Sequence, residues 1–211
     1  MDMHLVAALS ADDASMRLKA ALAIGSNPEP DQVDSLVARC AIESDFYVRD
    51  MLTWALTRMP SQIAVPKLLV ELGSERPQAR SRALHTLSKI KSAGAWPAIT
   101  RSLLRDPDDE VARSAWRAAV VLVPAGQERD LAEELAALLG RGDREVQLSL
   151  SRALVALGEE VIGPIVEKAM ASEDARVRAH ASATGRLLRD PKAGSQAAVE
   201  GAKRIYALGE E

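Results

Sequence analysis

A repeat of about 32 residues is the feature of this sequence that most constrains its fold. Six apolar marker residues follow one another at spacings of 32, 31, 32, 35 and 31 residues. Five of them have Asp three positions earlier, four are followed directly by Arg, and all six have Ala or Leu four positions later. The markers are Met16, Val48, Ala79, Val111, Val146 and Val177. A period of this length indicates an array of stacked supersecondary units.

Each unit is predicted to be a hairpin of two helices, called here helix A and helix B. The marker opens helix B, and the Asp before it suits an N-cap, where a carboxylate accepts hydrogen bonds from free backbone amides. The preceding segment carries apolar residues at i, i+3, i+4 and i+7, as in residues 65–72, which predicts helix A. Three prolines at similar offsets before their markers are expected in the first turn of helix A: Pro66, Pro97 and Pro164.

These observations predict an all-α fold in a single domain over residues 1–211. Aromatic residues make up only 3% of the chain, and Ala-rich hairpins that pack closely explain how a core forms with so few rings. The wide fourth spacing predicts a longer loop near residues 124–130, and a last helix at residues 194–208 is expected to cap the array. The six predicted repeats cover residues 1–27, 28–60, 61–92, 93–124, 125–158 and 159–190.

The pattern resembles the HEAT-repeat family, especially the short bacterial type. The segments Asp45-Phe46-Tyr47-Val48-Arg49 and residues 174–181 match its Asp-x-x-Val-Arg-x-x-Ala motif closely. The resemblance implies a right-handed α-α superhelix with the B helices on the concave side. It also implies that the Asp and Arg columns form a ladder between neighbouring repeats. Departures at Arg76, Ala112 and Gln147 predict that this ladder is broken around repeats three to five.

The concave groove is the predicted binding surface. Positions near +2, +5, +6 and +9 from each marker are expected to line it, because offsets 0, +4 and +7 or +8 face the core. Two of the three Trp residues fall at these offsets, and exposed Trp and Arg are enriched in binding hot spots. The predicted partner-binding residues are Trp54, His85, Arg113, Trp116, Arg117, Arg152 and Arg186.

Charge is divided unevenly between the two helix sets. The chain has a net charge of −3, which disfavours a globally basic nucleic-acid binder. The six predicted B helices, however, hold fifteen Lys or Arg against three acidic residues, a net of +12, and the remainder carries −15. We therefore interpret the groove as a basic surface for an acidic protein or peptide, and the protein as a non-enzymatic scaffold.

Two alternatives remain open from sequence. Asp50 and Trp54 share a helix face, with Arg82, Arg113 and Trp116 expected across the groove. That set is similar to the site of HEAT-like DNA glycosylases, in which a carboxylate flanked by Trp works beside basic residues on the phosphate backbone. The second alternative is a bilin-lyase-like subunit acting with a partner, which rests on the family resemblance alone.

Little else in the sequence points to chemistry. The three His residues have no His or Cys neighbours at metal-ligand spacing, so neither a metal nor another cofactor is predicted. Cys40 is the only cysteine and falls at an apolar helical position, which indicates a buried thiol. The N-terminus lacks the features of a signal peptide, and no apolar run approaches the length of a membrane span. A cytoplasmic location is the resulting expectation.

Overall fold

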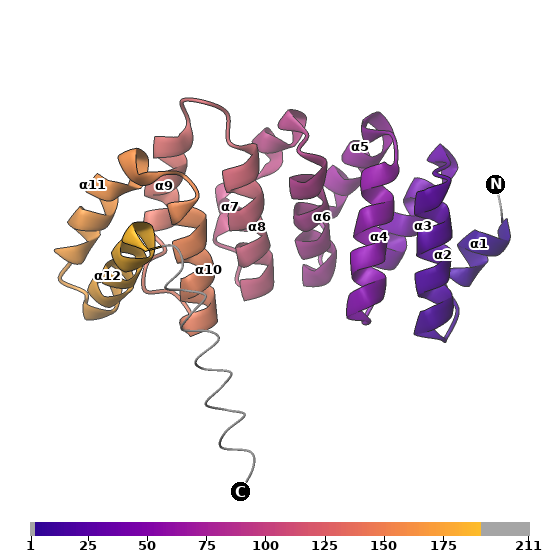
Figure 1. Ribbon diagram of the computed structural model, residues 1–211, viewed down its shortest axis with the longest axis horizontal. Coiled ribbons are helices and arrows are strands. Elements are labelled where there is room, and N and C mark those ends of the chain that lie inside the picture. The colour runs from indigo at the N-terminus through magenta and orange to yellow at the C-terminus, as the bar shows by residue number, and fades with distance from the viewer. Residues whose placement is uncertain (1–2, 191–211) are drawn as a thin grey trace, which may run out of the picture. The chain divides into compact units, whose positions relative to one another are not determined.

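The computed structural model describes residues 3–190, and every regular element in that range is a helix (Figure 1). The predicted all-α class is therefore confirmed. The chain divides into two compact units, Met1–Pro124 and Ala125–Glu211, called unit 1 and unit 2. The division falls at the predicted boundary between repeats four and five. The expected capping helix at residues 194–208 lies outside the described residues.

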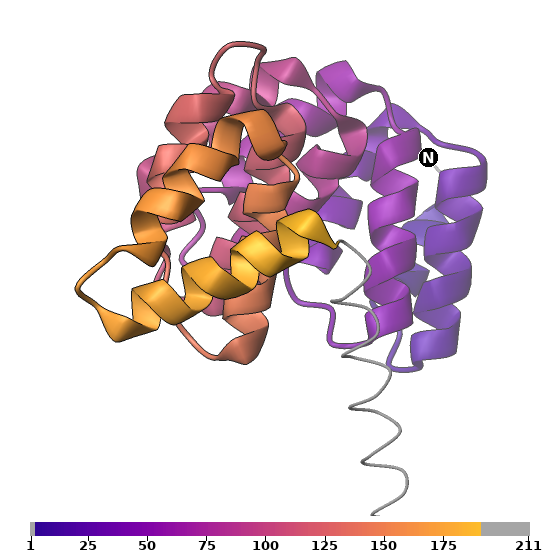
Figure 2. The same cartoon turned by 60° about the vertical axis from the view of Figure 1, so that its left-hand side comes forward.

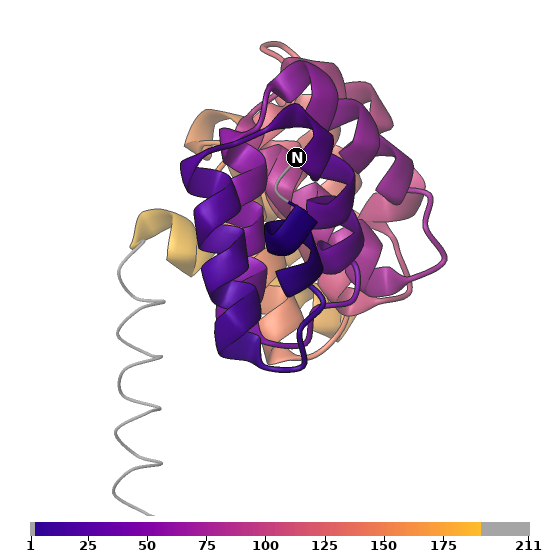
Figure 3. The same cartoon turned by 90° about the vertical axis from the view of Figure 1, so that its right-hand side faces the viewer.

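Unit 1 consists of four stacked hairpins. Its B helices α2, α4, α6 and α8 pack against one another in order, and each also packs on its own A helix (Figure 1). Figure 3 views this stack from its N-terminal end, with α1 beside α2. The helices are α1 (Met3–Ala8), α2 (Ala14–Ser26), α3 (Val33–Cys40), α4 (Phe46–Arg58), α5 (Ser61–Glu71), α6 (Pro77–Ile90), α7 (Arg101–Leu104) and α8 (Asp109–Leu122), with 3₁₀ turns η1 (Pro30–Gln32) and η2 (Ala93–Ala98).

Unit 2 holds two more hairpins built in the same way. Its A helices α9 and α11 pack together, and so do its B helices α10 and α12 (Figure 2). The helices are α9 (Glu128–Ala136), α10 (Arg144–Val155), α11 (Glu159–Met170) and α12 (Ala175–Arg189). Residues 3–190 thus contain the six predicted hairpins. Within each unit the neighbouring hairpins stack as in an α-solenoid.

The Asp column caps the B helices as predicted. The five side chains each accept a hydrogen bond from a backbone N–H in the first turn of their helix, at 2.7–3.4 Å. Repeat three has Arg76 in this position instead, and α6 begins there with Pro77, which has no N–H to cap. The capping residues are Asp13, Asp45, Asp108, Asp143 and Asp174.

The expected position of the three prolines is wrong. Pro66 and Pro164 lie inside α5 and α11, because these helices begin several residues before the proline. Pro97 lies in η2, and helix A of repeat four is reduced to this 3₁₀ turn and the four residues of α7. A proline in this region cannot donate to the preceding turn, which is consistent with the interruption of a regular α-helix.

The Arg column closes the turn between the A and B helices. Nη1 of Arg80 donates to the carbonyl oxygens of Ser74 and Glu75, and its Nε and Nη2 bind both oxygens of Asp106 in the next turn at 2.9 and 3.0 Å. Arg17 and Glu43 form the same arrangement between repeats one and two. Arg49 of repeat two differs: its Nη1 donates to the carbonyl oxygens of Glu43 and Ser44 in its own turn and reaches no acid of repeat three. The ladder is therefore interrupted after repeat two and resumes at Arg80, which differs from the expected break around repeats three to five.

Small side chains allow the B helices to approach closely. The alanines that face the neighbouring B helix are at most 2% exposed, among them Ala20, Ala55, Ala83 and Ala115. Leucines fill the space between the A and B layers, and these too are fully buried. This packing accounts for a core with few aromatic rings. The fully buried leucines of unit 1 are Leu9, Leu36, Leu52, Leu56, Leu68, Leu84 and Leu87.

Candidate functional site

One stripe of side chains on the B helices of unit 1 is open to solvent. It consists of Leu22, Trp54, His85 and Arg117, the +6 positions of α2, α4, α6 and α8, and we call it the outer stripe. Leu22 is 47% exposed and Trp54 is 37% exposed, whereas His85 is half-buried and Arg117 exposed. The stripe is therefore apolar on α2 and α4 and polar on α6 and α8.

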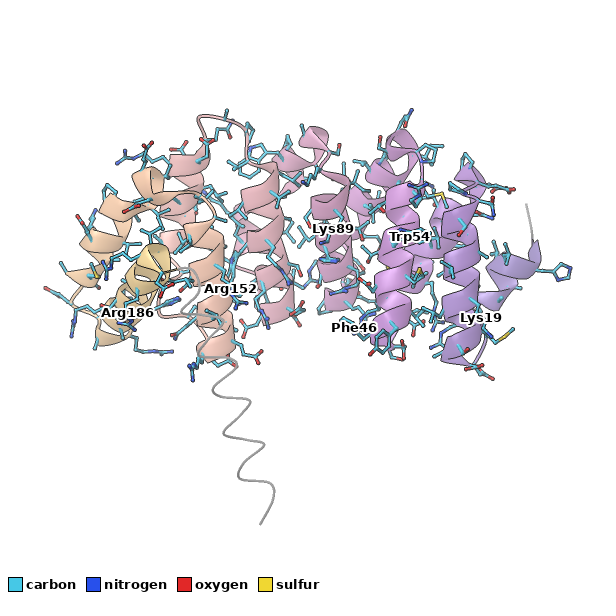
Figure 4. The ribbon with its side chains drawn as sticks, viewed as in Figure 1. Lys19, Phe46, Trp54, Lys89, Arg152 and Arg186 are labelled. Carbon is cyan, nitrogen blue, oxygen red and sulfur yellow. The ribbon has the colours of Figure 1, made fainter. Side chains whose placement is uncertain are left out.

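Gly25 on α2 makes room for the Trp54 indole. A Cβ atom built on Gly25 would lie 2.7 Å from Cε3 of Trp54 and 2.9 Å from the backbone of Ala55 on α4. A glycine at this point thus lets α4 approach α2 and lets one face of the indole lie on α2, while the other part of the ring stays exposed. Figure 4 shows Trp54 on α4 and Lys89 on the neighbouring helix α6.

Three guanidinium groups gather around one carboxylate beside the stripe. Glu110, in the first turn of α8, lies 3.2 Å from Arg117, 3.6 Å from Arg113 and 3.8 Å from Arg82 on α6. We call these four residues the Glu110 cluster. Three cations and one carboxylate give these four side chains a net positive charge.

His85 lies within this positive region. Burial lowers the pKa of His85, and the nearby Arg82, Arg117 and Lys89 lower it further, whereas Asp50 acts in the opposite direction. The resulting pKa is about 4, so the imidazole is neutral at neutral pH. His85 therefore adds a hydrogen-bonding group to the surface and no charge.

The placement of Trp116 in the groove is wrong. Trp116 is 0% exposed, and its Nε1–H donates a 2.8 Å hydrogen bond to the carbonyl of Leu104 on α7. The ring therefore belongs to the core between the A and B layers. A buried Trp cannot stack on a nucleotide or a partner, so the set of Asp50, Trp54 and Trp116 proposed for a glycosylase is not assembled.

The prediction that the groove is lined by +5 residues is wrong for most repeats as well as for Trp116. The +5 positions face the core or the next B helix, and five of the six are buried: Ala21, Thr53, Leu84, Trp116 and Ser151. The reason is that an inner B helix contacts the A layer on one side and a B helix on each flank. Three covered sides leave a narrow exposed strip, which runs through the +6 and +10 positions.

The other predicted residues are open to solvent to different degrees. Arg117 is exposed, and the side chain of Arg113 is 28% exposed. Arg152 on α10 and Arg186 on α12 are exposed in unit 2 (Figure 4). The candidate site is built from residues of unit 1 alone.

Sequence reasoning missed several exposed groups. Leu22 and Lys89 occupy the +6 and +10 positions and could have been found from the register of Trp54, since residues four apart share a helix face. Phe46 and Tyr47 at the start of α4 are 64% and 71% exposed, with their rings edge to face at 5.6 Å. No periodic signal marks these two, because they precede the marker Val48.

The described residues offer little that would support catalysis. Cys40 is buried as predicted, and burial raises the pKa of its thiol to about 12, so it is a poor nucleophile. No three His, Cys, Asp or Glu side chains in residues 3–190 gather in a way that could hold a metal ion. Within the same range no helix has both the length and the apolar character needed to cross a bilayer.

Comparisons with known proteins agree with this architecture. Residues 40–120 match the family described as HEAT repeats. One similar solved structure is the complex of CpcE and CpcF of phycocyanin lyase from Nostoc sp. PCC7120, with 23% identity, a TM-score of 0.51, and coverage of 87% of this chain and 75% of that chain. Another is an engineered protein, with 19% identity and a TM-score of 0.47, covering 89% of this chain and 98% of that one.

A search of curated proteins finds no match. At 23% identity the likeness to the CpcE–CpcF structure shows the fold alone. The family match covers helices α4 to α7 and most of α8, which include Trp54, His85 and the Glu110 cluster. Residues 40–120 thus match the HEAT-repeat family, in agreement with the resemblance seen in the sequence.

Proposed function

We propose that this protein is a non-enzymatic scaffold whose unit 1 binds a protein or peptide along the outer stripe. The observation that carries the proposal is the exposure of Leu22 and Trp54 side by side on packed helices, next to an excess of Arg. Trp and Arg are among the residues most enriched in binding hot spots. A partner residue that packs on an aromatic ring contributes more binding free energy where the ring is already fixed in place, because less conformational entropy is lost.

The positive excess favours an acidic partner. Lys89 and the three Arg residues of the Glu110 cluster lie with the carboxylates of Glu110 and Asp50 in one region, and these six side chains carry a net charge of +2. Opposite charges speed the encounter and select against basic partners. The complex of CpcE with CpcF is an instance of a similar fold that assembles with another protein.

The test compares two exposed aromatic residues of α4. A partner is first recovered from the source cells with the wild-type chain, purified, and titrated against variants by isothermal calorimetry. Trp54→Ala is expected to weaken binding at least tenfold, because the indole is the largest apolar group of the stripe. Tyr47→Ala, a change at a more exposed ring outside the stripe, is expected to leave the affinity within about twofold.

A second variant separates binding from folding. Trp54 also packs on Gly25, so its loss affects stability as well as the surface. Leu22→Gln alters the same stripe at a side chain that is 47% exposed and is expected to weaken binding with little change in the thermal midpoint. Unchanged affinity in both Trp54→Ala and Leu22→Gln would refute the proposal.

A further inference from the structure

The Glu110 cluster has the composition of an anion-binding site in which the bound anion is a carboxylate of the same chain. Its carboxylate lies 3.2–3.8 Å from three guanidinium groups, on two different helices. Arginine is the side chain that best matches a carboxylate, through its planar array of donors. The three Arg side chains thus form an anion-binding site in which the carboxylate of Glu110 now lies.

Glu110 is a replaceable occupant. Its side chain is 48% exposed, and its contacts with Arg82 and Arg113 are at 3.8 and 3.6 Å, longer than a direct charged hydrogen bond. By contrast, the carboxylate of Glu43 is fully buried and accepts from Arg17 at 2.7 and 2.8 Å. The loose geometry around Glu110 indicates that the carboxylate can turn out into solvent at small cost.

Arg117 is held in place without Glu110. Arg117 donates from Nε to the carbonyl of Arg113 and from Nη2 to the hydroxyl of Ser114, at 3.2 and 3.0 Å. Ser114 is fixed in turn by a 3.0 Å hydrogen bond to Ser81 on α6. The Arg117 side chain therefore keeps its position when the Glu110 carboxylate leaves, which lowers the cost of ordering it for another anion.

The charge of Arg82 is incompletely balanced. Its side chain is 19% exposed, and burial lowers the pKa of its guanidinium, with Arg49 and Arg117 acting in the same direction against Glu110 and the Cys40 thiol. A partly desolvated cation with further cations around it gains from each additional carboxylate nearby. This supports a site that takes a second anionic group or exchanges its own.

We infer that a carboxylate of an acidic peptide partner binds to Arg82, Arg113 and Arg117 in the place of Glu110, which competes with it as an internal occupant. The inference rests on the proposed function, since it specifies the chemistry of the partner for the same surface. It makes Glu110 a residue that weakens binding, although Glu110 belongs to the binding surface. A basic patch without an internal carboxylate would not have this property in any of its residues.

The experiment measures fluorescence anisotropy of a fluorescein-labelled hexaglutamate peptide at low salt. Glu110→Gln keeps the size of the side chain and removes the competing charge, and is expected to tighten binding on the order of fivefold. Arg117→Gln is expected to weaken it by about the same factor. Glu133→Gln on α9 is the matched control, because Glu133 forms a similar exposed contact with Arg129 at 3.6 Å, and it should leave the affinity unchanged.

The outcomes are distinct. Glu110→Gln binding no more tightly than wild type, or no more tightly than Glu133→Gln, would overturn the inference, and so would equal binding of a hexalysine peptide. Absence of any hexaglutamate binding by wild type and Glu110→Gln would also overturn it. Failure of the proposed function shows elsewhere, as unchanged partner affinity in Trp54→Ala and Leu22→Gln.

Discussion

Glu43 is predicted to be the most sensitive polar residue of unit 1. Its carboxylate is 0% exposed and accepts four hydrogen bonds: two from Arg17, one from Arg39 and one from the N–H of Asp45, at 2.7–2.8 Å. It thereby ties together repeat one, helix α3 and the first turn of α4. Glu43→Gln keeps the shape, but it places an amide N–H₂ beside guanidinium donors and leaves two cations without their acid.

The size of the effect follows from the pKa of Glu43. Burial alone raises this pKa, but the hydrogen bonds from Arg17, Arg39 and Asp45 more than offset it and bring the pKa from 4.5 to about 2. At 1.36 kcal/mol per unit, a difference of that size sets a ceiling of about 3 kcal/mol. Because the side chain of Arg39 is 18% exposed and water screens its charge, we expect Glu43→Gln to cost about 2 kcal/mol.

The same pKa fixes the dependence on pH. The folded state holds the carboxylate ionised, so the stabilisation is fully present above about pH 4.5, where the unfolded chain is ionised as well. It is lost as the pH falls from there towards about 2, because the unfolded chain then binds a proton that the folded chain does not. The difference between wild type and Glu43→Gln should shrink over that range.

Urea unfolding followed by Trp fluorescence tests this directly. All three Trp residues lie in unit 1, so the signal reports the unit that contains Glu43. Asp34→Asn is the matched control: it also removes one negative charge, but its pair with Lys67 at 2.9 Å is 71% and 49% exposed, and we expect a cost below about 1 kcal/mol. Equal shifts of the urea midpoint in Glu43→Gln and Asp34→Asn would refute the reasoning.

Three further predictions concern two packing contacts and one titrating histidine. Trp116→Phe should cost about 2–3 kcal/mol in thermal unfolding, since it opens a void and leaves the Leu104 carbonyl without its donor, whereas Trp54→Phe should cost less than about 1 kcal/mol. Gly25→Ala should destabilise unit 1 by about 1–3 kcal/mol, because the new methyl group meets Trp54 and the backbone of α4. Gly163→Ala in α11 has open space and should instead be neutral or stabilising. Burial lowers the pKa of His180, and the N–H of Gly140 donates to its Nδ1, so the folded state keeps this imidazole neutral. The unfolded chain then binds the proton first, and stability should fall as the pH drops below about 6.5, a fall that His180→Gln should reduce when melting is followed by circular dichroism.

The fold was predictable because its signals are local and recur six times. An Asp three residues before each marker specifies a helix start through its own first turn, and no distant residue is needed to read it. The prolines were misplaced for the opposite reason. Nothing in the neighbourhood of Pro66 shows that α5 begins five residues earlier at Ser61, because the packing of the A layer allows a helix to tolerate a proline inside it.

The site was predictable only in part, because one residue of helical register decides whether a side chain is exposed. Trp54 and Trp116 stand at +6 and +5 from their markers, about 100° apart on a helix. An isolated amphipathic helix has a wide polar face on which both positions would be open. In the stack, α4 has α2 and α6 on its flanks and α3 behind it, and α8 has α6 beside it and α7 behind it. The part of each B helix that stays exposed is therefore narrower than the angle of about 100° that separates the +5 and +6 positions. The rule that follows can be checked in repeat five, where Ser151 at +5 is 3% exposed and Arg152 at +6 is exposed. Substitution of Ser151 by Trp should therefore disrupt the packing of α10 on α12, where Ser151 bonds His180 and Thr184, whereas Arg152→Trp should leave the fold of unit 2 intact.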